Sequence, residues 1–97
     1  MTYSELKTAL EAACDAVYEW EAPAGAKRFV VLSPYGTVGV IADNAVQLDI
    51  CWQTDGDTLL ADVKAALTAG DTPYSVEDVS YDPDYAAMRA IVQLEVL

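Results

Sequence analysis

Residues 45–54 alternate apolar and polar side chains, and this pattern constrains the fold more than any other in the chain. Side chains in a β-strand point to opposite faces in turn, so the alternation predicts a half-buried strand. The apolar face would consist of Val46, Leu48, Ile50 and Trp52. Such a face must be covered by other elements, which favours a sheet with helices packed against it.

The rest of the chain supplies the partners that this strand needs. Apolar residues at helical spacing predict two helices, at 3–16 and 58–69, each with a start signal. Thr2 and Glu5 form a capping-box pattern, and Asp57 is a candidate N-cap for the second helix. Gly70 is the expected stop of that helix. Residues rich in β-branched and aromatic side chains predict four further strands, at 18–20, 28–33, 74–81 and 87–96.

Together these elements predict an α+β fold, a two-layer sandwich. Its sheet would be mostly antiparallel and four- to five-stranded, with both helices packed on it. The 97 residues suit a single domain spanning 1–97. Gly36, Gly39 and Asp43-Asn44 interrupt the apolar residues between two strands, so we expect a protruding loop or arm at about 34–45.

Composition excludes several classes of function. The chain has sixteen acidic and five basic residues, a net charge of −11, and no histidine. Five scattered bases cannot form the basic patch that binds nucleic acid or an anionic membrane. The longest apolar runs are far shorter than the ~20 residues that span a bilayer. The first residues lack the pattern of a signal peptide, so we expect a protein that is not secreted.

The two cysteines are far apart in sequence and belong to no Cys-x-x-Cys pair. Cys14 and Cys51 each lie on or next to an apolar face, which favours two reduced thiols in or near a core. A disulfide is the alternative, although intracellular proteins rarely keep one.

Paired acids at two turns are the only candidates for metal chemistry. Asp55 and Asp57 flank a glycine, and Asp82 and Asp84 flank a proline. Two carboxylates at this spacing can share a cation, but Asp is also common in turns and at helix caps. We favour the turn-and-cap interpretation, with weak calcium or magnesium binding as the alternative. No catalytic, cofactor-binding or metal-binding residue is predicted, and the protein is not expected to be an enzyme.

Several tyrosine and tryptophan side chains occur at strand ends, in turns or in the arm. Tyr and Trp are common anchors of protein interfaces. The expected subunit contacts are Tyr35, the arm residues Val38, Val40 and Ile41, and Trp20. An exposed apolar arm would otherwise be a liability.

The order of elements resembles the tail-completion or tail-terminator proteins of long-tailed bacteriophages and prophages. The similar stretches are residues 42–55, the helix 59–67, the Gly70-to-Tyr74 turn and the closing strand that ends with Val96. The Ser4-to-Lys7 segment of the first helix fits as well. The likeness covers nearly the whole chain but lies in a pattern of elements, without a catalytic signature.

The resemblance implies a structural protein that forms a ring, usually of six subunits, at the head end of the tail. Its partners would be other copies of itself, the tail tube protein and the head–tail connector protein, in the virion tail after assembly in the bacterial cytoplasm. Carboxylates that face the lumen would repel DNA phosphates, and the candidates are Asp55, Asp57, Asp82 and Asp84. A head-completion protein is a related alternative, and an acidic DNA-mimic inhibitor of a nucleic-acid enzyme is an alternative from another class.

Overall fold

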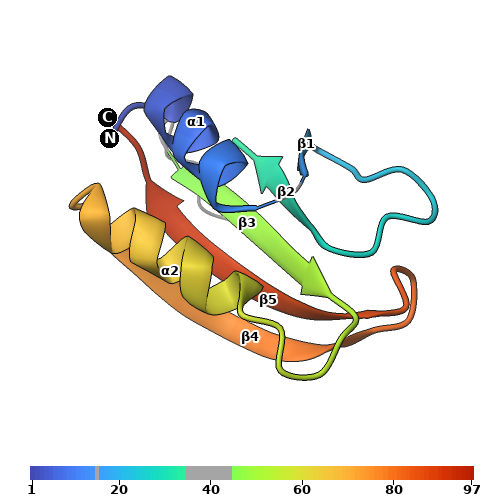
Figure 1. The fold of residues 1–97 in the computed structure, drawn as a ribbon. Coiled ribbons are helices and arrows are strands. Elements are labelled where there is room, and N and C mark those ends of the chain that lie inside the picture. The colour runs from blue at the N-terminus through green and yellow to red at the C-terminus, as the bar shows by residue number, and fades with distance from the viewer. Residues whose placement is uncertain (15, 35–44) are drawn as a thin grey trace.

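A computed structural model describes residues 1–14, 16–34 and 45–97. In chain order these residues form α1 (Tyr3–Ala13), β1 (Val17–Glu19), β2 (Phe29–Ser33), β3 (Ala45–Trp52), α2 (Leu59–Ala69), β4 (Tyr74–Asp82) and β5 (Ala87–Glu95). The strands form one sheet in the order β1-β2-β3-β5-β4, and both helices lie on the same face of it (Figure 1). Among the described strands, the β1–β2 pair is the only parallel one. The predicted α+β fold, a mostly antiparallel sheet with two packed helices, is confirmed.

The position of β4 follows from the way α2 crosses the sheet. β3 and β4 each pair antiparallel with β5, so they run in the same direction with β5 between them. α2 connects them across the helix-covered face, as in a split β-α-β unit. This connection leaves β4 as one edge strand of the sheet and β1 as the other.

The main core lies between the helices and the sheet. The predicted inward face of β3 is confirmed, because its apolar residues are buried in one core with α1 and α2, and β5 contributes apolar residues to the same core. The fully buried members of this core include Leu6, Leu10, Val30, Leu32, Leu48, Ile50, Leu59, Val63, Leu67, Ala90 and Val92. Trp52 packs on the same core and is partly buried.

A second, smaller core lies on the face of the sheet opposite the helices. It contains Phe29, Val31, Cys51 and Ala87. The chain between β1 and β2 crosses this face, where Ala22 and Ala26 pack on the cluster. The sheet is therefore apolar on both faces near its β1 end.

The ends of both helices refine the sequence predictions. The capping box of α1 is present: Thr2 N donates to Glu5 Oε1 at 2.9 Å and Glu5 N donates to Thr2 Oγ1 at 3.2 Å. These hydrogen bonds lower the pKa of Glu5, and the one from the Thr2 backbone has the larger effect. α1 ends at Ala13, earlier than the predicted residue 16, because Cys14 is already extended.

α2 ends at Ala69 with Gly70 as its C-cap, as predicted, but the glycine does not supply the left-handed backbone that follows the helix. Gly70 follows the last helical residue but has an ordinary negative φ, and the left-handed residue is Asp71, with a φ of 52°. A Cβ at Gly70 would collide with the Met1 side chain. Met1 therefore packs against position 70, and the flexible end of its side chain would have to shift to admit a Cβ there.

Candidate protein-binding edge of the sheet

The nine-residue strand β4 is the most exposed regular element among the described residues. Seven consecutive residues, 75–81, are exposed although they belong to a strand. Within the described ranges, no backbone hydrogen bond links β4 to any element other than β5. One side of β4 thus offers unpaired backbone donors and acceptors, which is the usual template for an added strand.

A β-bulge determines which β4 side chains share a face. The register with β5 shifts between Val76 and Asp78, so Glu77 is an extra residue. As a result Val76 pairs with Val92 and Val79 pairs with Ala90, and both lie on the helix side of the sheet. Without the bulge these two valines, three residues apart, would point to opposite faces.

The helix side of β4 is an exposed apolar strip. Val76 is 38% exposed, Val79 48% and Tyr81 60%, although all three lie on the helix side of the sheet. Tyr74, at the start of the strand, is partly buried against the main core. We call Val76, Val79 and Tyr81 the β4 strip.

The opposite side of β4 carries hydroxyl and carboxylate groups. Ser75 Oγ donates to Glu77 Oε1 at 2.6 Å, and Ser80 Oγ donates to Asp78 Oδ2 at 2.8 Å. From Asp71 to Met88, with both ends included, the chain has five acidic residues and no basic one. The edge is therefore apolar on one side and negatively charged on the other.

Asp82, at the end of β4, is a buried carboxylate and has structural partners. Its Oδ2 lies 3.0 Å from Arg89 Nη1, and its Oδ1 accepts hydrogen bonds from the backbone amides of Asp84 and Tyr85. Arg89 Nη1 lies 3.9 Å from Asp49 as well. This arrangement closes the turn between β4 and β5.

The same cluster surrounds Cys51 with groups that keep its thiol neutral. Burial raises the pKa of Cys51 most, the Asp49 carboxylate raises it further, and together they bring it from 9.0 to about 12. A reactive cysteine needs its thiolate form near neutral pH. Cys51 is thus a core residue with an unreactive thiol, and Cys14 is also buried and forms no disulfide with it, as predicted.

We expect native Cys51 to react with iodoacetamide at pH 8 at least about tenfold more slowly than in urea, because its neutral, buried thiol cannot attack. Peptide mapping by mass spectrometry after timed labelling measures this. Since the thiol pKa is higher in the folded state, its contribution to stability is complete below pH 9.0 and declines as pH rises toward about 12. Equally fast labelling in both states would contradict the expectation.

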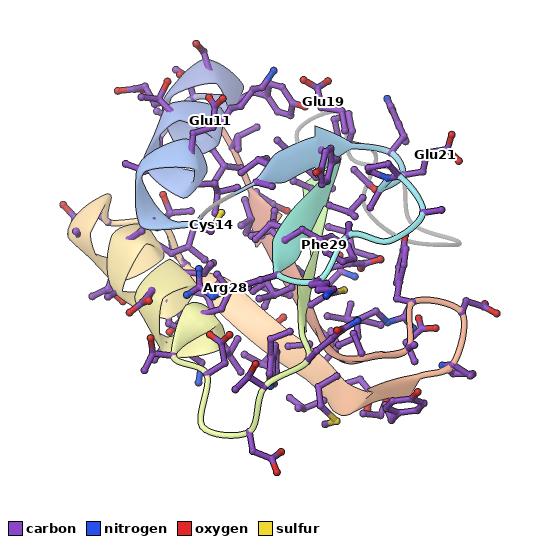
Figure 2. The ribbon with its side chains drawn as sticks, turned by 45° about the vertical axis from the view of Figure 1, so that its right-hand side comes forward. Glu11, Cys14, Glu19, Glu21, Arg28 and Phe29 are labelled. Atoms are coloured by element: carbon purple, nitrogen blue, oxygen red, sulfur yellow. The ribbon has the colours of Figure 1, made fainter. Side chains whose placement is uncertain are left out.

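The predicted lumen-facing acids fall into two groups. Arg28 Nε donates to both carboxylate oxygens of Asp57, to Oδ1 at 3.1 Å and to Oδ2 at 3.0 Å. Asp57 Oδ1 also accepts a hydrogen bond from Leu59 N at 2.8 Å. Figure 2 shows Arg28 extending from the chain before β2 toward the start of α2. Asp82 is only 9% exposed. Asp55 and Asp84 are exposed, so they are the two of the four whose carboxylates are presented to solvent.

The predicted subunit contacts can be placed only in part. Trp20 is 50% exposed at the end of β1 and has a φ of 71°, an uncommon backbone conformation for a bulky residue. Tyr35, Val38, Val40 and Ile41, the arm residues, lie outside the described residues, as does the predicted arm itself except for Pro34 and Ala45. The predicted contacts therefore remain predictions.

The β4 strip was missed by sequence reasoning. Residues 74–81 were expected to form a strand, but the Glu77-Asp78 pair hides the alternation of its faces. The signal that could have revealed the strip is the spacing of Val76 and Val79, with tyrosines at both ends of the strand. An acidic residue inserted between two alternating halves is typical of a bulge on an edge strand.

Among residues 1–14, 16–34 and 45–97, no three Cys, Asp or Glu side chains are grouped so that they could hold a metal ion. In those ranges no helix has the length and apolar character needed to cross a membrane.

Comparison with known proteins found no match for this chain among protein-family models, curated proteins or solved structures.

Proposed function

We propose that the protein is a structural subunit of a bacteriophage or prophage tail, similar to the ring that terminates the tail tube and joins it to the head. The observation that carries the proposal is the exposed edge strand β4, with the β4 strip on one of its sides. An edge of this kind is suited to holding another polypeptide. The resemblance of the element order to tail-completion proteins supplies the biological setting.

The chemistry of the buried polar groups supports a binding role. The thiol of Cys51 is kept neutral, and Arg89 pairs with Asp82 in a turn. The Arg28 guanidinium holds Asp57 at the start of α2. Each of these groups stabilises the fold, so the surfaces left for function are the exposed ones.

In the proposed ring, copies of the chain contact one another, and the tail tube protein and the head–tail connector protein dock on its two sides. Trp20 and the arm residues are the candidate contacts between copies. Asp55 and Asp84 are the stronger candidates for a surface that faces the lumen, because their carboxylates are exposed. Such carboxylates would repel the phosphates of passing DNA.

We expect light scattering across a concentration series to show an oligomer, and negative-stain microscopy to show rings. Replacing Trp20 by serine should shift the oligomer toward the monomer by about tenfold or more in dissociation constant, because half-exposed tryptophans are common anchors of interfaces. Tyr81→Ser, at a similarly exposed aromatic residue on the opposite edge, is the matched control and should leave self-association unchanged.

The opposite outcomes are equally informative. A monomer at every concentration, both alone and mixed with tail tube and connector proteins, would overturn the ring. Capture of a nuclease or restriction enzyme, with loss of its activity, would instead support the acidic DNA-mimic inhibitor.

A further inference from the structure

We propose that the β4 edge binds a basic, extended segment of a different protein, which adds to the sheet as a sixth strand. This inference rests on the proposed function in one respect only, namely that the protein works by holding its neighbours. It names the chemistry of one neighbour: a segment in which apolar residues alternate with Lys or Arg.

The backbone of β4 provides the first requirement. After the bulge, residues 78–82 pair regularly with β5, so their outward side has the even spacing of a normal strand. Five residues match the usual length of a strand that pairs with a sheet edge. An added strand would satisfy the outward backbone groups of this run and gain affinity from them.

The two sides of β4 provide the second requirement, a preference for one side-chain pattern. On the helix side an incoming strand would place its apolar residues beside Val79 and Tyr81. On the other side its alternate residues would lie beside Asp78 and Ser80, where the carboxylate of Asp78 is exposed. Cross-strand pairs of opposite charge stabilise a sheet, and like charges destabilise it.

Charge also argues against a second copy as the occupant. The strands β1 to β5 contain a single basic residue, Arg89, which already pairs with the buried Asp82. Two β4 strands placed together would bring the acids at 77 and 78 of one copy close to those of the other.

The bulge and the acids therefore select which strands can pair with the β4 edge. Both features are known ways of preventing sheet edges from pairing with themselves. In this chain they stop β4 from pairing with another β4, but they leave residues 78–82 open to a partner of opposite charge. Selection by charge also raises the rate at which such a partner associates.

In the test, each of three synthetic peptides is added to the full-length protein. The first alternates valine with lysine or arginine over about eight residues, enough to cover the five-residue run with ends to spare. The second has glutamate in place of each base. The third has the composition of the first but groups its valines together, so that it keeps the charge and loses the alternation. Binding is followed by NMR shifts of the backbone amides and by their hydrogen exchange.

Two charge-reversal variants show whether location matters. Asp78→Lys lies on the β4 edge, and Glu11→Lys lies on α1 (Figure 2), and both residues are exposed. Each change raises the net charge by two, so the pair separates a local effect from a general one. Amide spectra of both variants establish that they fold.

We expect the first peptide to bind, to shift the amides of β4 and to slow their exchange. The glutamate and grouped peptides should bind at least about tenfold more weakly, because they lack the charge or the alternation that strand addition needs. Asp78→Lys should weaken the binding of the first peptide by about tenfold, and Glu11→Lys should weaken it by less than about twofold.

Several results would overturn the inference. These are equal binding of all three peptides, equal effects of the two variants, or shifts that lie outside β4. If the only ligand found for this edge is a second copy of the chain, the inference is also wrong. Rings without peptide binding would remove this inference alone, whereas peptide binding by a chain that never forms rings would remove the ring and leave the inference standing.

Discussion

Replacing Asp82 by alanine is expected to lower the free energy of unfolding by about 2–3 kcal/mol, since it removes a buried carboxylate that accepts two backbone amides and pairs with the partly exposed Arg89 guanidinium. The carboxylate is 9% exposed and contacts Arg89 Nη1 at 3.0 Å. Arg89 Nε is buried and has no hydrogen-bond acceptor among the described residues. Without Asp82 the guanidinium would keep only Asp49, at 3.9 Å.

Asp82→Asn is the matched control, because it separates the charge from the turn. An asparagine oxygen can still accept the amide hydrogen bonds of Asp84 and Tyr85, which Asp82 Oδ1 accepts at 2.8 and 3.3 Å. The asparagine variant should therefore lose less stability than the alanine variant. Urea unfolding followed by circular dichroism measures both. If the alanine variant is within about 1 kcal/mol of the wild type, then Asp82 is not the partner on which this buried charge depends.

The sequence was sufficient to predict the elements that bury one continuous face. The alternation at 45–54 and the helical spacing at 3–16 and 58–69 correspond to β3, α1 and α2. These predictions succeeded because burial on one face produces a period in the residues themselves. The observed ends differ from the predicted ones by no more than three residues, and at α1 the reason is the extended backbone of Cys14.

Features that depend on distant contacts could not be predicted in the same way. The second core joins Phe29 of β2 with Tyr85 of the β4–β5 turn, and nothing in the local sequence connects these residues. Asp82 and Asp57 look in the sequence like ordinary turn and cap residues, because aspartate is common at both positions. Each, however, also forms an ion pair with an arginine from elsewhere in the chain. The roles of these acids become visible only when the strands are paired.

The candidate site shows the same division. That residues 74–81 form a strand was predicted, but that this strand lies at an edge depends on the place of β5 between β3 and β4. The bulge at residues 76–78 then converts an irregular sequence into one apolar side and one acidic side. Edge position and bulge are properties of the pairing, so a single sequence contains only weak signs of them.

Replacing Phe29 by alanine should cost about 3–5 kcal/mol of unfolding free energy, because a buried aromatic side chain leaves a large cavity. Phe29 has no exposed surface and is the largest side chain of the second core. Its ring contacts those of Tyr18 and Tyr85 edge-to-face, with centroids 6.1 and 5.1 Å away. The chain between β1 and β2, in which Figure 2 labels Glu21 and Arg28, packs on this cluster through Ala22 and Ala26.

Phe29→Leu is the control that keeps most of the apolar volume and removes the ring contacts. It should cost about 1–2 kcal/mol, since an edge-to-face pair contributes about 0.5–1.5 kcal/mol beyond its buried area. Urea unfolding gives both values, and native-state hydrogen exchange locates the effect. The alanine variant should speed exchange first at the β1–β2 amide pairs, such as Val30 N to Ala16 O, before the helices are affected. If both variants are as stable as the wild type, or if α1 and α2 lose protection first, the second core does not hold the β1–β2 connection in place.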